Sequence, residues 1–348
     1  MSRILHIGKF FPPHRGGMES VLRDTMNQQC QEGMKVSAVV HSTERRLTDQ
    51  AETTTLGYRI IRAARWFTIN FAPIAPTFAW SVHKEISQLK PDAIHIHMPN
   101  LSAFWLLVLP SARALSWKIH WHSDVVASQY RAGLRFFYRF YQPFEYLMLR
   151  KAQHIAVSSP PYLEHSIPLQ RFRHKCLIEP IHIDRQRIMA AAKSVHRLDR
   201  NPSEGLRVLC VGRLTYYKDF GTAIRAIAEL PEATLHIAGS GAERESLTAI
   251  INSLEVSDRV TLLGEVSEAE LWKQYRWCDV LCLPSVERTE AFGVVILEAA
   301  VFGKPSIVAD TQGSGMGWAI HQVTPRGLMF KAGDARDLAG KLARISEI

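Results

Sequence analysis

Two glutamates near the end of the chain, Glu290 and Glu298, have the spacing that most limits the chemistry this sequence could perform. The preceding run 279–284 is apolar and predicts a short strand, residues 285–289 are polar, and apolar residues recur at helical spacing from Phe292 onward. Eight residues along a helix span about 12 Å, so the two carboxylates cannot form a tight acid and base pair. They could instead bind the two ends of one long ligand.

The segment between these glutamates places Phe292, Gly293 and Val294 at the expected start of the helix. Backbone N–H groups at a helix start are directed at anions. A nucleotide diphosphate-sugar presents sugar hydroxyls, a diphosphate and ribose hydroxyls in that order, which matches a carboxylate, amide groups and a second carboxylate. The alternative is a surface helix whose two carboxylates are solvated.

Two cations, Arg213 and Lys218, occupy the loop that follows the apolar run 206–212. Cations in this place can neutralise a diphosphate while the bond to it breaks. As structural residues alone they would be ordinary solvated charges.

The chain opens with the same pattern of strand, loop and helix. Residues 3–8 predict a strand, and an amphipathic helix follows the loop and extends to about Gly33. Gly16 and Gly17 stand where this helix begins, so a ligand could approach the backbone closely. Their spacing is not G-x-G-x-x-G, so no dinucleotide fingerprint is present, and a plain turn is the alternative.

Strands and helices alternate along two series, which predicts two α/β domains with parallel sheets covered on both faces. We expect an N-terminal domain over 1–190, a C-terminal domain over 205–348, a linker at 185–205 and a ligand cleft between the domains. Further strands are predicted at 36–41, 58–62, 93–97, 117–121, 154–158, 176–179, 234–238, 260–263, 280–283 and 305–309.

Two predicted strands end at or beside a histidine, where the loops of a parallel sheet gather. One ends at His97, and the other, 117–121, is followed directly by His122, with Asp124 close behind. A single histidine at a strand end is more often structural than catalytic, and we interpret His97 in this way.

The segment E-A-F-G-V-V-I-L-E (290–298) resembles the E-x7-E signature of retaining glycosyltransferases with two Rossmann-like domains, the GT-B type, in a family that includes many mannosyltransferases. The resemblance implies that Glu290 holds donor-sugar hydroxyls and Glu298 the ribose. W-H-S-D around His122 is similar to a family segment whose histidine reaches the donor sugar near the leaving diphosphate.

Other segments carry the resemblance less closely. Arg213 and Lys218 resemble the family's G-R-L-x-x-x-K-G pair, with Asp219 in place of the usual glycine. His182 stands where the family's crossover segment has glycine, and 236–241 lacks the usual proline. By the same resemblance, Gly16 and Gly17 lie against the donor phosphates or the acceptor. The family's crossover helix is not apparent before the chain ends at 348.

This resemblance implies a retaining hexosyltransferase in cell-surface polysaccharide or lipopolysaccharide synthesis, with a GDP- or UDP-linked sugar as donor substrate and no other cofactor. No carboxylate is placed as a covalent nucleophile, which fits the family's front-face displacement. No D-x-D pair follows a strand, so we expect no metal. The predicted catalytic residues are His122, Arg213, Lys218 and Glu290, and the predicted donor-binding residues are Gly16, Gly17, Phe292, Gly293, Val294 and Glu298.

Composition supports a globular chain. The 348 residues are 47% hydrophobic and 22% charged, and no apolar run is long enough to span a membrane. The five cysteines have no C-x-x-C spacing, which is typical of buried thiols in a reducing cytosol. A zinc site at Cys278 and Cys282 is not expected, since no histidine is near.

The net charge of +9 lies in the first half, where residues 1–184 contain 22 Lys/Arg and 13 Asp/Glu. Residues 129–151 predict a helix that presents Arg131, Arg135 and Arg139 among aromatic residues and that kinks or ends at Pro143. Such a helix fits either an anionic membrane surface or a domain core with solvated arginines.

We therefore expect a cytoplasmic enzyme, peripheral on the inner face of the plasma membrane, whose acceptor is a saccharide or a lipid-linked saccharide. Nucleic acid is not an expected partner. The alternatives are a non-catalytic basic binding protein on the same scaffold, a nucleotide-sugar epimerase or a glycogen-type phosphorylase.

Overall fold

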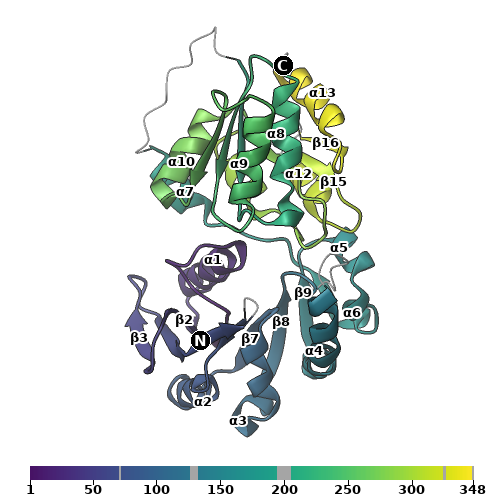
Figure 1. Cartoon of the computed structure of the whole chain (residues 1–348). Coiled ribbons are helices and arrows are strands. Elements are labelled where there is room, and N and C mark those ends of the chain that lie inside the picture. Colours follow the sequence, from purple (N-terminus) through teal and green to yellow (C-terminus); the bar gives the residue numbers. More distant parts are fainter. Residues whose placement is uncertain (70–71, 126–131, 194–204, 324–326, 347–348) are drawn as a thin grey trace. The chain divides into compact units, whose positions relative to one another are not determined.

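The computed structural model describes residues 1–69, 72–125, 132–193, 205–323 and 327–346. The chain divides into two compact units, Met1–Ile183 and Asp184–Ile348. The expected linker begins with a helix, α7 (Arg185–Lys193), and the remainder of it, 194–204, lies outside the described residues. Each unit is a sheet with helices on its faces (Figure 1).

The first unit contains an eight-stranded sheet in the order β10-β9-β8-β7-β1-β2-β4-β3. All neighbouring strands are parallel except β3 with β4. The strand order reverses between β1 and β7. Its strands are β1 (Arg3–Ile7), β2 (Lys35–Arg45), β3 (Gln50–Thr53), β4 (Arg59–Arg65), β7 (Ala93–Met98), β8 (Ser116–Trp121), β9 (His154–Val157) and β10 (Cys176–Ile178), and a separate hairpin pairs β5 (Phe67–Ile69) with β6 (Ala72–Ile74).

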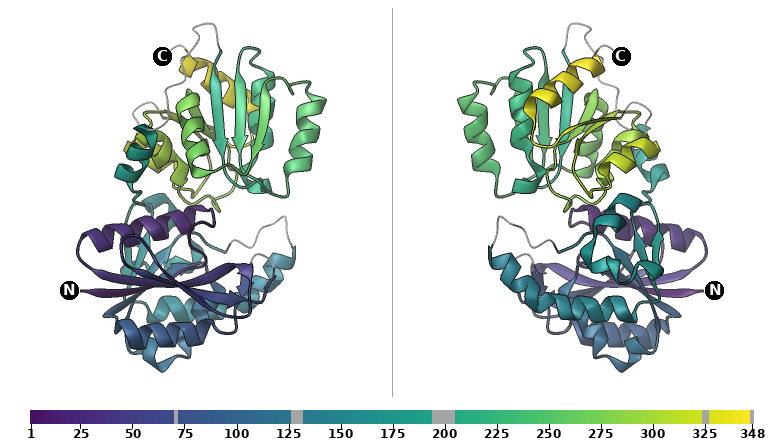
Figure 2. Two further views of the ribbon diagram at one scale, coloured as in Figure 1. Left: turned by 90° about the vertical axis from the view of Figure 1, so that its left-hand side faces the viewer. Right: turned by 90° about the vertical axis from the view of Figure 1, so that its right-hand side faces the viewer.

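Helix α1 lies on one face of this sheet and α2 and α3 lie on the other (Figure 2). Under α1, Leu22 and Met26 pack on alternate residues of the central strands, including Ile4 and Ala38, because side chains two apart on a strand share a face. The helical elements are α1 (Gly17–Gln31), α2 (Phe78–Leu89), η1 (Leu101–Leu107), α3 (Pro110–Arg113), α4 (Ala132–Lys151), α5 (Pro160–His165), α6 (Ile167–Gln170) and η2 (Arg173–Lys175).

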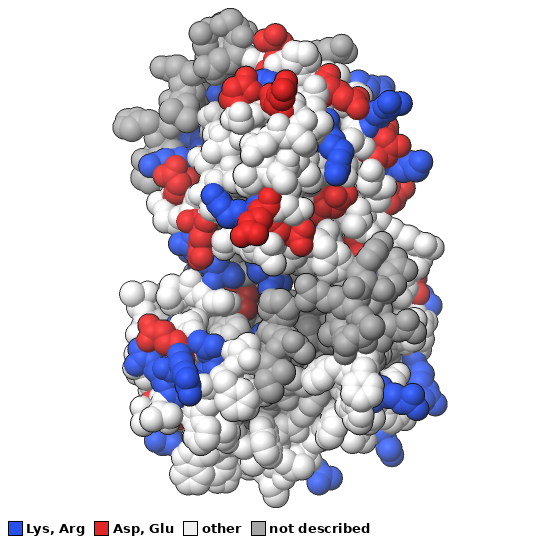
Figure 3. All heavy atoms as spheres, in the orientation of Figure 1, with Lys and Arg blue, Asp and Glu red and all other residues white. Residues whose placement is uncertain are grey.

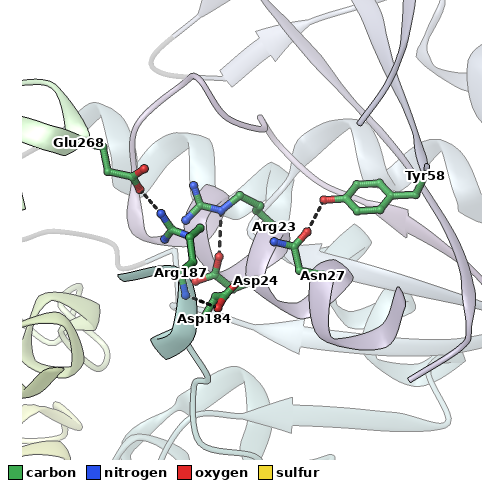
Figure 4. A network of polar contacts seen from close by, with 7 residues as sticks. All are labelled: Arg23, Asp24, Asn27, Tyr58, Asp184, Arg187 and Glu268. Carbon is green, nitrogen blue, oxygen red and sulfur yellow. Dashed lines mark hydrogen bonds and ion pairs between the residues drawn. The ribbon is translucent and has the colours of Figure 1, made fainter. Parts of the chain in front are cut away.

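Polar side chains of α1 and α7 make short local contacts (Figure 4). Tyr58, just before β4, donates its hydroxyl to Asn27 of α1 at 2.7 Å, which connects the helix to the start of that strand. In the second unit, Arg187 of α7 pairs with Glu268 at 2.7 Å.

The second unit has a six-stranded parallel sheet in the order β13-β12-β11-β14-β15-β16. In chain order this is 3-2-1-4-5-6, the doubly wound arrangement in which ligands bind where the order reverses, here between β11 and β14. The strands are β11 (Arg207–Val211), β12 (Thr234–Ala238), β13 (Val260–Gly264), β14 (Val280–Leu283), β15 (Ser306–Asp310) and β16 (Leu328–Lys331). The predicted architecture of two Rossmann-like α/β domains is confirmed.

Continuous apolar strands such as β11 and β14 suit a sheet with helices on both faces. Helices α8, α9 and α13 contribute the core on one face, with Phe220, Leu247 and Leu338 buried. The helical elements are α7, η3 (Tyr216–Lys218), α8 (Phe220–Ala228), α9 (Arg244–Ser253), α10 (Glu268–Trp277), α11 (Val294–Val301), α12 (Met316–Val323) and α13 (Ala335–Ser346).

The sequence predicted that α4 would kink or end at Pro143, and the helix does not end there. Tyr141 and Glu145 on either side of the proline are buried, so packing holds the helix across the missing N–H group. Arg131 and the side chain of Arg135 lie outside the described residues, whereas Arg139 is exposed.

The described helices include none that is both long and apolar enough to cross a membrane. Acidic and basic side chains are interspersed on the second unit, whereas the coloured side chains on the visible face of the first unit are mostly Lys and Arg (Figure 3). This distribution agrees with the sequence, in which the basic excess falls in the first half.

Candidate active site

The structure brings together two of the predicted catalytic residues, Lys218 and Glu290. Lys218 ends η3 in the loop after β11, and Glu290 lies in the loop after β14, so both follow the strands between which the sheet order reverses. The Lys218 Nζ atom forms an ion pair with Glu290 Oε2, and the two side chains are only 10% and 15% exposed.

The charge of Lys218 is maintained by this contact. Burial acts to lower the pKa of Lys218, but the Glu290 carboxylate and Tyr217 raise it, and the net pKa lies above the ordinary lysine value. The ammonium group is therefore charged at neutral pH. A cation held beside a carboxylate at a sheet reversal suits a ligand that carries both phosphate and hydroxyl groups.

The loops that hold this pair are themselves hydrogen-bonded to each other. The Val286 N–H donates to the Tyr217 carbonyl at 2.8 Å, and the Tyr216 hydroxyl donates to Glu287 at 2.8 Å. The η3 loop and the β14–α11 loop thus carry two contacts besides the ion pair. Such contacts hold charged groups in place before a ligand binds.

A third loop, after β15, binds the backbone on both sides of the same segment. The Ser314 hydroxyl donates to the Glu290 carbonyl at 2.5 Å, and the Gly315 N–H donates to the Ala291 carbonyl at 2.8 Å. Residues 290 and 291 are therefore fixed by main-chain contacts, and the carboxylate of Glu290 is oriented by its backbone as well as by Lys218.

The three residues predicted at the helix start lie there. Gly293 caps α11 with φ of 78°, and Val294 is the first helical residue. A side chain at position 293 would approach Leu283 and Ile296 to 2.9 Å, so glycine is required both for conformation and for space. Phe292 is buried and meets the ring of Trp318 edge-on, with centroids 6.1 Å apart.

Glu298 does not join the ion pair. It lies on α11, where its carboxylate accepts a hydrogen bond from the Tyr275 hydroxyl of α10 at 2.7 Å. Burial and the nearby carboxylate raise the pKa of Tyr275 well above its usual value, so the phenol remains a donor. The predicted separation of the two glutamates, one on the loop and one on the helix, matches this placement. Arg213 is exposed in the loop after β11.

In the first unit, Gly16 is the N-cap of α1 and Gly17 is its first residue. A Cβ at position 16 would lie 2.2 Å from Oε2 of Glu19, a buried residue of the first helical turn. The backbone at Gly16 is thus approached by a carboxylate of the chain itself, which the sequence did not suggest.

His122 directly follows β8 and is bonded to His97, the histidine that the sequence led us to treat as structural. The His97 Nδ1 and His122 Nε2 atoms are 2.8 Å apart, and the two rings are stacked. Burial lowers the pKa of His122 to about 4, so its ring is neutral at physiological pH.

Several contacts of the site were missed from the sequence. Tyr216 and Glu287 lie in the segments we considered but carry no motif, and Tyr275 and Ser314 are remote from the residues they contact. Among the residues described, no three His, Cys, Asp or Glu side chains are grouped so that they could hold a metal ion. The five cysteines are free thiols.

Two doubly wound sheets in one chain are typical of GT-B glycosyltransferases, and in this chain a cation and a carboxylate lie at the reversal of the second sheet. The chain has the same fold as sucrose-phosphate synthase from Thermosynechococcus elongatus, with a TM-score of 0.78 at 22% identity over 99% of this chain and 90% of that one. A structure of Anabaena HepE in complex with UDP and glucose gives a TM-score of 0.69 at 16% identity over 99% and 92% of the two chains.

Sequence comparisons agree with the fold. Residues 196–348 match the family described as glycosyl transferases group 1, and residues 16–180 match the glycosyl transferase 4-like domain. The O-antigen chain mannosyltransferase C of Escherichia coli is 25% identical over 344 residues, which cover 97% of this chain and 86% of that protein. The two matched regions together extend over most of the chain, which is a glycosyltransferase of the GT-B type.

Proposed function

We propose that this enzyme transfers a hexose from a nucleotide-diphosphate sugar to a saccharide or lipid-linked saccharide with retention of anomeric configuration. The proposed hexose is mannose or a related sugar. The observation that carries the proposal is the buried Lys218–Glu290 pair at the reversal of the second sheet. A cation there suits the diphosphate, and a carboxylate beside it suits the hydroxyls of the sugar that the diphosphate carries.

The proposed roles follow from the placement of each group. Lys218, assisted by Arg213, neutralises the departing diphosphate, and Glu290 with the Phe292, Gly293 and Val294 amides orients the sugar. Glu298, positioned by Tyr275, holds the ribose. His122 contacts the donor sugar, and Gly16 and Gly17 lie near the donor phosphates or the acceptor.

In the proposed reaction the bond from the anomeric carbon to the phosphate oxygen breaks, and the acceptor oxygen bonds to the same face of that carbon. The departing phosphate oxygen takes the acceptor proton, so no enzyme carboxylate forms a covalent intermediate. Lys218 and Arg213 supply positive charge at the diphosphate throughout, and the reaction requires no metal ion or additional cofactor.

A lipid-linked acceptor is supported by the surface of the first unit and by the nature of the relative. The basic excess belongs to the first half of the chain, and α4 exposes Phe136, Phe140 and Phe144 to solvent. The E. coli relative is named as an O-antigen chain mannosyltransferase. We accordingly propose a cytoplasmic enzyme that associates with an anionic membrane surface and has no nucleic acid partner.

The test is release of nucleotide diphosphate from GDP-mannose, UDP-glucose and ADP-glucose in parallel, each with and without a lipid-linked saccharide acceptor. We expect acceptor-dependent release from one donor and an α-linked product by NMR from an α-linked donor. Glu290→Gln protein gives the background rate. Conversion of the donor sugar without release of nucleotide would identify an epimerase instead, and acceptor-independent binding without turnover would identify a binding protein.

A further inference from the structure

Five histidines gather on one face of the first sheet, around the point where its strand order reverses. They come from the three central strands β1, β7 and β8, and neighbouring strands pair His6 with His95 and His97 with His120. Because side chains two apart on a strand share a face, all five rings lie on the face that α1 also covers. The five residues are His6, His95, His97, His120 and His122.

Three of these rings form one continuous chain of hydrogen bonds that begins at a helix side chain. Gln29 of α1 lies with its Oε1 atom 2.8 Å from His6 Nε2. The His6 Nδ1 atom is 3.2 Å from His97 Nε2, and the His97 Nδ1 atom is 2.8 Å from His122 Nε2. We call this set, Gln29–His6–His97–His122, the histidine chain.

The Gln29 side-chain oxygen is a hydrogen-bond acceptor, and this sets the direction of donation along the whole histidine chain. An amide oxygen accepts and never donates, so the proton on His6 must be on Nε2, which leaves its Nδ1 atom to accept. His97 must then donate from Nε2 and accept at Nδ1. By the same rule His122 donates from Nε2, and its Nδ1 atom is left with a lone pair.

These tautomers require each ring to carry a single proton, and burial of the rings favours that state. Burial lowers the pKa of His6 to about 4, with Lys118 contributing in the same direction, and it lowers the pKa of His97 well below the usual value. His97 is also stacked on His120 with ring centroids 4.7 Å apart, which holds its plane. A neutral imidazole carries one proton, so a ring that donates from one nitrogen must accept at the other.

The free end of the chain lies at a place suited to a ligand. His122 is half-buried directly after the carboxyl end of β8, and its Nδ1 atom makes no hydrogen bond within the described part of the chain. A lone pair there can accept a hydrogen bond from a hydroxyl group and repels the oxygen atoms of a phosphate.

We propose that Gln29, His6 and His97 are positioning residues which hold His122 as its Nε2–H tautomer, so that His122 Nδ1 accepts a hydrogen bond from a sugar hydroxyl. The ligand part of this inference rests on the proposed function, because it takes the donor sugar as the group that meets His122. The tautomer part does not, because it is a property of the protein without ligand.

The tautomer is measured directly on protein with 15N-labelled histidine, in long-range 1H–15N correlation spectra at pH 8. The His122 signals are assigned from the spectrum of His122→Asn. In the wild type we expect a protonated Nε2 and an unprotonated, pyridine-like Nδ1 at His122. A protonated Nδ1 in the folded wild type would overturn the proposal without any variant or substrate.

Two substitutions of Gln29 test whether this residue sets the direction of hydrogen-bond donation along the histidine chain. Gln29→Glu keeps only an acceptor and should preserve the wild-type tautomer, whereas Gln29→Lys offers only a donor and should move the proton of His122 to Nδ1. The control is Gln28→Lys, an exposed neighbour on the same helix that bonds to Glu32, which should change neither. An unchanged His122 tautomer in folded Gln29→Lys would contradict the chain.

Kinetics test the ligand part. Gln29→Lys should lower kcat/KM for the donor by about tenfold, because the contacted hydroxyl can no longer donate to His122 Nδ1 and must reorient to accept from it, while Gln29→Glu and Gln28→Lys remain near wild type. With the wild type, a donor in which fluorine replaces the contacted hydroxyl should show a similar loss of kcat/KM. With Gln29→Lys, the same replacement should lower kcat/KM little further. Additive losses of kcat/KM from the variant and from the fluorinated donor would overturn the sugar contact. Absence of turnover with every donor would overturn the proposed function. The tautomer measurement would still test the histidine chain in that case.

Discussion

The ammonium of Lys218 and the carboxylate of Glu290 are paired across two loops, and both side chains are largely withdrawn from water. Neither charge can be removed without leaving the other in a poorly solvated place, where an unpaired charge costs several kcal/mol. The pair is therefore expected to be important for stability as well as for binding, and the two contributions can be separated.

Lys218→Met should lower both stability and turnover, because Glu290 loses its cation. We expect roughly 3 kcal/mol less stability in the second unit and at least a hundredfold loss in kcat/KM. The double variant Lys218→Met/Glu290→Gln should recover most of the stability but not the activity. Lys273→Met is the matched control, since that lysine is exposed and its pair with Glu270 should contribute less than about 1 kcal/mol. Recovery of turnover in the double variant would exclude a role of Lys218 at the diphosphate.

Glu290→Ala and Glu298→Ala should differ in kind. A group that holds ribose binds ground state and transition state alike, so Glu298→Ala should mainly raise the donor KM, whereas Glu290→Ala should also lower kcat. Each lost charge-assisted hydrogen bond should be worth about 1.5 to 3 kcal/mol.

Tyr275→Phe provides the structural control for this comparison, because it removes the hydroxyl that donates to Glu298 at 2.7 Å and to the Val295 carbonyl at 3.5 Å while Glu298 stays in place. It should raise the donor KM in the same direction as Glu298→Ala but less. Equal and negligible effects of the two glutamate substitutions would exclude both carboxylates from donor binding.

Local sequence patterns were sufficient to predict the strand, loop and helix around Glu290 and the loop that carries Lys218. Both follow from short runs whose hydrophobic period and polar breaks are visible within a few residues. Their mutual contact was not predictable, because it depends on β11 and β14 being neighbours although they are far apart in sequence. The contact of Tyr275 with Glu298 was not predictable for the same reason.

The hydrogen bonds of the histidine chain were not predictable from the sequence, for a different reason. The alternation in 95–97 and 120–122 is visible in the sequence, and it indicates that these rings share a face. The direction of the chain is nevertheless set by Gln29, a helix residue that nothing in the sequence connects to His6. Of the two outcomes predicted at Pro143, a kink or an ending, the ending does not occur, because buried neighbours outweigh the local cost of proline in α4.

Glu145 of α4 should make the first unit less stable as pH rises. Its side chain is buried and accepts a hydrogen bond from Tyr138 at 3.0 Å, and burial raises the pKa of Glu145 to about 7 despite that bond. The folded state therefore binds a proton more tightly than the unfolded state. Stability from this group is complete below pH 4.5, falls as pH rises to about 7 and is then constant.

Glu145→Gln removes this dependence, so the variant should gain about 3 kcal/mol over the wild type at pH 8 and little at pH 4.5. Thermal unfolding followed by circular dichroism from pH 4.5 to 8 provides the measurement. Glu164→Gln, at an exposed position of α5, should show no such divergence. A difference independent of pH would mean that Glu145 remains ionised in the folded protein.

Turnover should not require a divalent ion, because Lys218 and Arg213 already offset the charge of the diphosphate in the proposed reaction. Treatment with EDTA followed by gel filtration should leave the rate of nucleotide release unchanged within about twofold. If activity were lost and restored by Mn²⁺ alone, the role assigned to the two cations would be wrong.

The surface of α4 should bind membranes that carry negative charge. Phe136 and Phe140 are 70% and 60% exposed on this helix, and Arg139 between them is also exposed. Aromatic rings insert at the lipid interface, and each basic residue near an anionic surface contributes about 1 kcal/mol, which salt screens. Binding to vesicles with anionic lipid should therefore weaken as ionic strength rises.

Replacing Phe136, Arg139 and Phe140 together by Ser should lower vesicle binding at least tenfold, and replacing Arg131, Arg135 and Arg139 by Ser should remove most of its salt dependence. The matched control carries Ser at Lys331 and Arg336, exposed cations of the second unit, and should bind as the wild type does. Sedimentation with vesicles of neutral and anionic composition measures both effects. A folded Phe136→Ser/Arg139→Ser/Phe140→Ser protein that binds anionic vesicles as well as the wild type would leave the basic charge of the first unit to be explained by a soluble, anionic acceptor.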